Sequence, residues 1–291
     1  MKIEEFMMYL DPLKQGISST LWGQGYREPC FMWILRKEAK GDLGVDIGAN
    51  LGYATLSLCK NMSKVIAIEP DRKSRKLLKK NIKINNFKNK VKIYNFAISD
   101  SMGESIIYFF RKNPNLNTLC KPKTLKSSKD FIRKEMIKTK TIDSLNVLPN
   151  FIKMDIEGYE IEAIEGGIET FKKSKNCKIL IEVHPHYYTK KRSFAKILEK
   201  LFTIGFKVKY IVSAGTECPN LFQEKNYKPI KIMNDQEHRR GIFVNISEED
   251  AINFCSFSHS QEYKSKNDKG VVINKQTKKI VRSILLVKTK L

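Results

Sequence analysis

Several features that define common protein classes are missing from this chain of 291 residues. No apolar run approaches the ~20 residues that a membrane span needs. The six cysteines form no C-x-x-C pair and the four histidines form no H-E-x-x-H pattern, so neither a zinc ribbon nor a redox motif is indicated. The opening segment MKIEEFMMYLDPLKQG contains acids and too short an apolar stretch for a signal peptide. We therefore expect a cytoplasmic protein with reduced thiols.

Arginine is also scarce, with 10 residues against 44 lysines in a chain of formal net charge +23. Proteins that read phosphates or bases specifically tend to use arginine, because its planar guanidinium pairs in a bidentate manner. The lysines are spread along the chain, and we find no RNA- or DNA-binding motif. A solvated lysine-rich surface is therefore the favoured interpretation, with contact to nucleic acid or to an anionic membrane as the alternative.

Two phosphate-binding patterns are absent as well: the dinucleotide fingerprint G-x-G-x-x-G and the P-loop G-x-x-x-x-G-K-[ST]. In their place the segment LGVDIGANLGY has an apolar strand that ends in Asp46, a loop that contains Gly48 and Gly52, and the start of a helix. Glycines allow a ligand to lie against bare backbone. The next apolar run, KVIAIEP, ends in Glu69, where a carboxylate can accept hydrogen bonds from ribose hydroxyls. A nucleoside without phosphate fits this pattern, and D-x-G-x-x-x-G at residues 46–52 resembles the first motif of S-adenosylmethionine-dependent methyltransferases. The resemblance implies that the cofactor is S-adenosyl-L-methionine.

Strand and helix patterns alternate along most of the chain, which predicts an α/β fold with right-handed crossovers. A further strand is expected at Ser105–Phe110, and Arg111–Asp130 has the composition of a loop. The predicted helices are Glu28–Lys40, Tyr53–Lys60, Asp71–Ile84, Tyr159–Ser174, Lys191–Thr203 and Glu248–Phe257. After the first strand, the predicted strands are Val65–Ile68, Val91–Ala97, Phe151–Ile156, Lys178–Val183, Phe206–Val212 and Ile280–Lys288.

These segments suggest four parts. We expect an N-terminal extension over residues 1–41, a cofactor-binding core over 42–212, an insertion over 213–279 that shapes the acceptor side, and a final strand of the core within 280–291. The last strand is placed to pair antiparallel with Phe206–Val212.

With its motifs in place, the chain resembles the FkbM family of S-adenosylmethionine-dependent methyltransferases. The matching segments are VDIGANLGYATL, AIEPD, AISD with MGES, TIDSL, ILIEVHP and above all FIKMDIEGYEIEAIEGG, within roughly Glu28–Val212. The resemblance implies a Rossmann-like class I methyltransferase fold, with a mostly parallel seven-stranded sheet, an antiparallel last strand and helices on both faces. Amino-methylating enzymes usually carry N-P-P-Y or D-P-P-Y where this chain has Asp155-Ile156-Glu157-Gly158. The resemblance therefore implies O-methylation of a sugar, glycan, glycolipid or small metabolite.

The cofactor-binding residues follow from these motifs and from the ends of the strands. We expect Asp46 to attract the amino group of the cofactor, Glu69 to hold its ribose, and Asp100 to lie near its adenine. The full expected set is Asp46, Gly48, Ala49, Asn50, Gly52, Glu69, Phe96, Ala97, Asp100 and Asp155.

Three residues are candidates for the chemistry, because methyl transfer to an alcohol is helped by a base near the hydroxyl proton. His184 is the leading candidate, since its side chain titrates near neutral pH. Asp155 could orient it, bind the cofactor or act as the base, and Glu182 ends the same strand as His184. His184 and His186 have only Glu182 as a nearby third ligand, and we expect no metal site.

Two other functions stay open from the sequence. The net charge allows an RNA methyltransferase, and the fold would also suit a cofactor-binding protein without catalysis. The expected partner is a small-molecule, glycan or lipid-linked acceptor, with peripheral membrane contact as a possibility.

Overall fold

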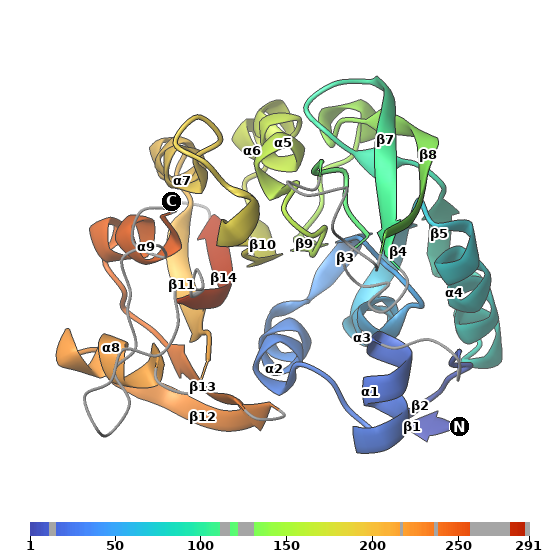
Figure 1. The fold of residues 1–291 in the computed structure, drawn as a ribbon, viewed down its shortest axis with the longest axis horizontal. Helices are drawn as coiled ribbons and strands as arrows, with labels where there is room; N and C mark the ends of the chain where they lie inside the picture. The colour runs from blue at the N-terminus through green and yellow to red at the C-terminus, as the bar shows by residue number, and fades with distance from the viewer. Residues whose placement is uncertain are drawn as a thin grey trace.

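A single mixed sheet runs through the centre of the computed structural model, which describes residues 1–11, 16–110, 117–121, 131–215, 218–235, 238–256 and 280–288. In Figure 1 the N-terminal half of the chain lies toward one edge of this sheet, and the C-terminal half lies toward the other edge. In spatial order its strands are β12 (Pro229–Asp235), β13 (His238–Phe243), β11 (Lys207–Ser213), β14 (Val281–Lys288), β10 (Cys177–Glu182), β9 (Phe151–Met154), β3 (Gly41–Ile47), β4 (Met62–Ile68) and β5 (Val91–Tyr94).

The pairing of these strands confirms the predicted fold class. Strands β5, β4, β3, β9 and β10 are parallel neighbours, whereas β14 pairs antiparallel with both β10 and β11. The predicted pairing of the last strand with Phe206–Val212 is therefore confirmed. The β12–β13 hairpin extends the seven-stranded arrangement to nine strands, an addition that the irregular composition of this segment did not predict.

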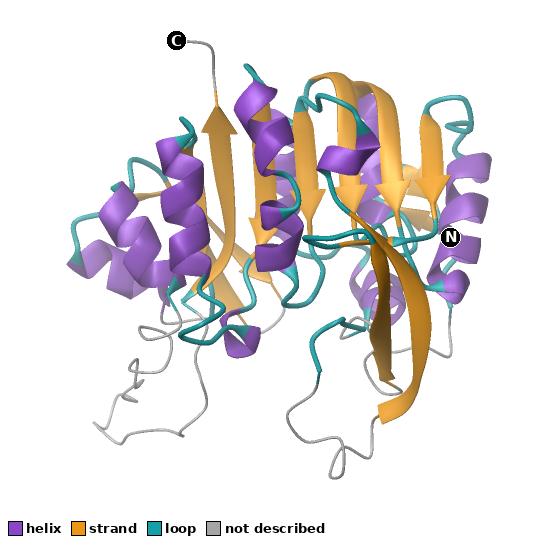
Figure 2. Ribbon diagram, turned by 90° about the horizontal axis from the view of Figure 1, so that it is seen from above, coloured by secondary structure: helices purple, strands orange, loops and turns teal. Residues whose placement is uncertain are grey.

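Helices cover both faces of the sheet (Figure 2). They are α1 (Ile17–Gln24), α2 (Pro29–Glu38), α3 (Tyr53–Asn61), α4 (Arg72–Ile84), α5 (Glu160–Glu165), α6 (Ile168–Lys173), α7 (Phe194–Thr203), α8 (Cys218–Glu224) and α9 (Glu248–Cys255). In the part of the chain that the structure describes, none of them has the length and apolar character to cross a membrane.

The central strands carry apolar side chains on both faces of the sheet, and each face has its own core. This follows because neighbouring side chains on a strand point to opposite faces. In β10, Ile179 and Ile181 pack in the same core as Leu198 of α7. Leu180, between them, belongs to the opposite core together with Ile34 of α2. All five side chains are fully buried, or nearly so, and each such burial contributes roughly 1.5–3 kcal/mol. A strand that is apolar on both faces therefore sits at the centre of the molecule.

The single helix predicted at Tyr159–Ser174 is wrong, because the segment forms two short helices, α5 and α6. Gly166 and Gly167 separate them. A Cβ atom on Gly166 would lie 2.1 Å from the carbonyl oxygen of Ser99, so only glycine allows this close backbone approach.

A second, smaller sheet stands out from the central one (Figure 2). It contains β6 (Ala97–Ile98), β7 (Gly103–Phe110) and β8 (Phe131–Lys140). The strand predicted at Ser105–Phe110 is confirmed within β7, but the strand predicted at Val91–Ala97 ends at Tyr94, and Ala97 pairs with β8 instead. Most of the predicted loop Arg111–Asp130, and most of the C-terminal half of the predicted insertion, lie outside the described residues.

The N-terminal segment packs on the core at one face of the central sheet. Strands β1 (Lys2–Ile3) and β2 (Phe6–Met7) form a small hairpin, and Ile3 and Phe6 are buried against the core that contains α2 and α3. The short 3-10 helices η2 (Asp143–Leu145) and η3 (Pro185–Tyr187) complete the fold.

Candidate cofactor and active site

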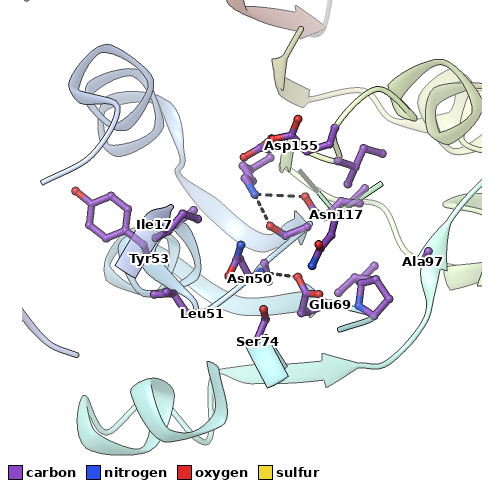
Figure 3. A pocket seen from close by; sticks show the side chains of 18 of the residues that line it. Ile17, Asn50, Leu51, Tyr53, Glu69, Ser74, Ala97, Asn117 and Asp155 are labelled. Carbon is purple, nitrogen blue, oxygen red and sulfur yellow. Dashed lines mark hydrogen bonds between the residues drawn. The ribbon is translucent and has the colours of Figure 1, made fainter. Parts of the chain in front are cut away.

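A cavity opens at the carboxyl ends of β3, β4 and β9, the edge where open α/β sheets bind ligands. It contains about 1090 Å³ of space between the atoms, part of it open to solvent. The residues that follow β3 and β4 form one wall, and those that follow β9 and precede α2 form another. Figure 3 shows Glu69 and Ser74 on one side of this space and Asp155 on another. The expected residues that line it are Gly48, Ala49, Asn50, Glu69, Ala97 and Asp155.

Glu69 is held by backbone groups at the end of β4. The backbone N–H of Asn50 donates to its Oε2 at 2.8 Å, and that of Asp71 donates to its Oε1 at 2.7 Å. Burial raises the pKa of Glu69 to about 7, although the hydrogen bond from Asp71 acts in the opposite direction. Each carboxylate oxygen keeps a second lone pair, so the side chain can still accept from a ligand hydroxyl in the cavity.

The loop after β3 needs glycines mainly because other protein atoms lie where a Cβ atom would be. Gly48 has φ +78°, and a Cβ atom there would lie 2.0 Å from the carbonyl oxygen of Asp155. Gly52 has φ +99°, and its Cβ would meet Leu78 of α4 at 2.7 Å. Gly52 does not line the cavity, and its contact with a ligand stays a prediction.

Asp46 lies behind the cavity wall and is fully buried. Its carboxylate accepts from the Thr55 hydroxyl at 2.5 Å and pairs with the Lys153 ammonium at 3.1 Å. Lys153 in turn donates to the carbonyl oxygen of Gly48 at 2.7 Å. Burial alone would lower the pKa of Lys153, but Asp46 holds it above its ordinary value. The structure therefore places Asp46 against Lys153 rather than at the cavity surface, which does not fit a direct contact with the cofactor's amino group.

Of the three residues predicted in the segment 96–100, only one lines the cavity. Ala97 lines the cavity together with the apolar residues Ile68 and Ile98. Phe96 is buried and packs against Tyr94 with ring centroids 5.1 Å apart, whereas Asp100 is exposed and accepts from the Ser99 hydroxyl at 2.9 Å. Neither Phe96 nor Asp100 lines the cavity.

The three catalytic candidates, His184, Asp155 and Glu182, lie close together, and of these only Asp155 lines the cavity. The His184 ring is 3% exposed and is surrounded by carboxylates. Its Nδ1 lies 2.8 Å from Glu160, while its Nε2 lies 3.1 Å from Glu182 and 3.3 Å from Glu157. A ring that donates from both nitrogens satisfies these contacts, and such a ring has no free lone pair to accept a proton.

Glu160 orients the ring from the buried side. It also accepts from the Tyr188 hydroxyl at 2.8 Å and from the Gly158 backbone at 3.0 Å. Burial alone would raise the pKa of Glu160, but His184 and the hydrogen bond from the Gly158 backbone hold it below its ordinary value.

Asp155 stands at the boundary between this cluster and the cavity. Burial raises its pKa to about 6, and the nearby Glu182 adds to the shift. His184 Nε2 is 4.0 Å from its Oδ1. At neutral pH the carboxylate is therefore ionised, yet it binds a proton more readily than an ordinary aspartate.

Two arginines neutralise the remaining carboxylates. Arg282 of β14 pairs with Glu182 at 2.6 Å and with Glu28 at 2.6 Å, and Arg27 pairs with Glu28 at 2.9 Å. Burial alone would raise the pKa of Glu28, but Arg27 and Arg282 hold it below its ordinary value. Ligand atoms of Asp155, Glu157 and His184, and of Glu28, Asp155 and Glu182, lie within 4.8 Å of one another. Arg282 pairs with two carboxylates of the second group, Glu28 and Glu182, and we assign no metal ion to either group.

The backbone at this edge is strained. Glu28 has φ 49° and Glu157 has φ 51°, in the left-handed region that long side chains rarely adopt. Both residues line the cavity. Such strain persists only where surrounding structure enforces it, and it is common at functional sites.

Sequence reasoning missed Lys153, Glu160 and Arg282. A signal existed for two of them, because Lys153 and Arg282 are charged residues inside apolar strands, FIKM and VRSILLVK. A buried charge needs a partner, so each of these cations indicated a buried acid nearby. Glu160 gave no such signal, since acids are common in the first turn of a helix.

The sheet order and the antiparallel β14 are those of the class I methyltransferase fold. The family model described as "Methyltransferase FkbM domain" matches residues 46–208, more than half of the chain. The protein therefore belongs to the FkbM family of methyltransferases.

Solved structures to which this chain is similar include a methyltransferase FkbM from Methylobacillus flagellatus KT, with 18% identity and a TM-score of 0.41 over 70% of this chain. This chain covers 44% of that one. Precorrin-6y C5,15-methyltransferase from Geobacter metallireducens GS-15 is 12% identical, with a TM-score of 0.42 over 85% of this chain and 97% of that one. The tRNA m1G37 methyltransferase of M. jannaschii is 16% identical, with a TM-score of 0.41 over 84% and 53%. No curated protein matches the sequence.

Proposed function

We propose that the protein is an S-adenosylmethionine-dependent O-methyltransferase that acts on a hydroxyl of a sugar, glycan, glycolipid or small metabolite. The observation that carries this proposal is the cavity between Glu69 and Asp155. It combines a hydroxyl-accepting carboxylate at the end of β4 with a cavity-lining carboxylate of raised pKa at the end of β9.

The lining residues fit S-adenosylmethionine. Glu69 keeps free lone pairs for two ribose hydroxyls, and Ile68, Ala97 and Ile98 offer an apolar surface for adenine. Glu28 and Asp155 give the other end of the cavity the negative charge that suits an amino group and a sulfonium. When bound, this cofactor supplies an electrophilic methyl group.

Asp155 is the base in this proposal. It lines the cavity, and a carboxylate with a pKa of about 6 can accept the proton of an acceptor hydroxyl more readily than an ordinary aspartate. Glu157 lines the cavity beside it and is the alternative base. His184 becomes a positioning residue, because its ring joins Glu160 on the buried side to Glu157 and Glu182.

An oxygen acceptor agrees with the sequence at the end of β9. Asp155-Ile156-Glu157-Gly158 stands where amino-methylating enzymes carry a tetrapeptide that ends in Pro-Pro-Tyr, and it supplies carboxylates that can take a hydroxyl proton. A strongly basic helix, α4, is the observation that keeps RNA as a second candidate acceptor.

A transfer assay with methyl-labelled S-adenosylmethionine and extract fractions from the protein's own organism tests this function. We expect label in a product that withstands mild base, as an ether does and a carboxyl ester does not. The label should survive nuclease treatment. Label that is released by nuclease would favour the RNA alternative, and absence of transfer with measurable cofactor binding would favour a protein without catalysis.

A further inference from the structure

A second open groove lies beside the cofactor cavity, between α2 and β12. It contains about 1580 Å³ of space between the atoms, part of it open to solvent. Arg27, Met32 and Tyr53 line both this groove and the cofactor cavity, so the two spaces are neighbours that share a wall. Nothing in the function proposed above uses the groove.

Two ammonium groups meet at one aromatic ring in this groove. Lys37, one turn after Trp33 in α2, places its Nζ 4.5 Å from the centroid of the Trp33 ring. Lys231 reaches the same ring from β12, with its Nζ at 5.4 Å from the centroid. Both lysines are exposed, and all three residues line the groove.

Neither of these two lysines forms an ion pair within the described part of the chain. Among the residues that the structure describes, neither Lys37 nor Lys231 has a carboxylate within 4.0 Å, whereas Arg27 pairs with Glu28 and Arg36 pairs with Glu4. Interaction with the ring gives each ammonium only about 0.5–1 kcal/mol at an exposed site. An anion between the two lysines would gain from both charges.

We infer that this groove binds an anionic sugar, with its phosphate or carboxylate between Lys37 and Lys231 and a C–H face of its ring against an aromatic side chain of the groove. The negative face of an aromatic ring attracts the weakly positive C–H groups of a sugar. A strand of nucleic acid would instead need cations and stacking rings repeated along its backbone. Here the ammonium groups of Lys37 and Lys231 both lie over the Trp33 ring, which fits one anionic group.

The position of the groove suggests that this sugar is the methyl acceptor or the part of it that anchors the rest. That assignment rests on the proposed function, because only a methyl transferase would need an acceptor next to its cofactor. Binding of an anionic sugar does not depend on it.

Trp33 provides a direct readout, since the chain has only two tryptophans. In a Trp22→Phe background, which removes the 63%-exposed Trp22, fluorescence reports on Trp33 alone. We would titrate this protein with glucose 6-phosphate, glucuronate, glucose, inorganic phosphate and an oligouridylate. We expect a saturable change with glucose 6-phosphate or glucuronate, and at least tenfold weaker binding of glucose and of phosphate. The two anionic sugars tell a phosphate ligand from a carboxylate ligand.

The double variant Lys37→Gln/Lys231→Gln should weaken sugar binding at least tenfold. Lys79→Gln/Lys83→Gln removes the same charge from two exposed lysines of α4 and should leave the affinity unchanged. Equal losses in both variants, preferential binding of the oligouridylate, or equal affinity for phosphate alone would overturn the inference. S-adenosylmethionine binding, measured in parallel by calorimetry, tests the proposed function separately. Its absence would leave a sugar-binding groove without a transfer function.

Discussion

The two ends of the cofactor cavity carry carboxylates of similarly raised pKa that are built in different ways. At one end, Glu69 accepts two backbone hydrogen bonds, and burial is the main reason that its pKa is about 7. At the other end, Asp155 has a pKa of about 6 because of burial and the neighbouring Glu182. Glu28, Glu157 and Glu182 surround that end, and side chains rather than backbone groups balance them.

This difference separates binding from chemistry. A carboxylate held by backbone amides keeps its position whatever the neighbouring side chains do, which suits the recognition of a constant cofactor. A carboxylate among other charged side chains has a proton affinity that each neighbour can adjust, which suits a base. Substitutions at the two ends should therefore change different measured quantities, and the predictions that follow use this contrast.

The largest effect is expected at Asp155. We predict that Asp155→Asn lowers kcat by ~10²–10⁴-fold, the usual contribution of a general base, with a smaller loss of cofactor affinity because Asp155 supplies part of the negative charge at this end of the cavity. In the unmodified protein kcat/KM should rise with pH through about 6, as the Asp155 carboxyl loses its proton, and this rise should be absent from the variant. Methyl-transfer rates measured from pH 5 to 8 check both statements.

Asp42→Asn is the matched control, because Asp42 is exposed and does not line the cavity. It should leave the rate within about twofold of the unmodified protein. If Asp155→Asn retained nearly full activity and Glu157→Gln lost it, Glu157 would be the base instead.

A second prediction concerns the buried pair beneath the cavity. Asp46→Ala leaves the Lys153 ammonium without its acid in a site where Lys153 is 4% exposed. Loss of one partner from a buried ion pair costs about 3–5 kcal/mol. We expect the free energy of unfolding, measured with urea, to fall by this amount.

The double variant Asp46→Ala/Lys153→Met separates the unpaired charge from the lost contacts. It should recover much of the stability, because no buried charge remains. A single variant that loses less than about 1 kcal/mol would contradict the role assigned to this pair.

Much of the fold could be predicted because apolar patterns are local. The strands that surround the cavity and the helix α4 were found within a few residues of their bounds, since each has a clear period. The break between α5 and α6 could not be found in this way. Helical periodicity does not register it, although the adjacent glycines Gly166 and Gly167 mark it, and the approach of the Ser99 backbone to Gly166 arises only in the folded chain.

Part of the candidate site could also be predicted from local sequence. Strand ends identified Glu69 and Asp155, because the position of an acid after an apolar run is itself a local feature. Which way a side chain faces is not local. Asp46 ends a strand in the same manner, yet it pairs with Lys153, and His184 meets Glu160 from another element. These partners decide that Asp46 and His184 lie outside the cavity lining.

The smallest of the expected effects is at Glu69. Glu69→Gln should weaken S-adenosylmethionine binding by ~1–3 kcal/mol, the range for loss of a charge-assisted hydrogen bond, with kcat at saturating cofactor little changed. Calorimetry at pH 8 gives the affinity. Glu5→Gln, which removes an exposed carboxylate paired with Lys60, is the control and should bind as the unmodified protein does.

The pH dependence tests the assignment more sharply. Because the pKa of Glu69 is about 7 in the folded protein and ordinary in the unfolded one, ionisation of Glu69 opposes folding. The stability that the protonated Glu69 side chain contributes is therefore complete below about pH 4.5, and it is lost as the pH rises through about 7. Ribose hydroxyls that donate to the carboxylate favour its ionised form, so cofactor affinity should rise as the pH increases through about 7. The glutamine variant should lack this rise, and an identical pH profile in both proteins would remove Glu69 from the cofactor site.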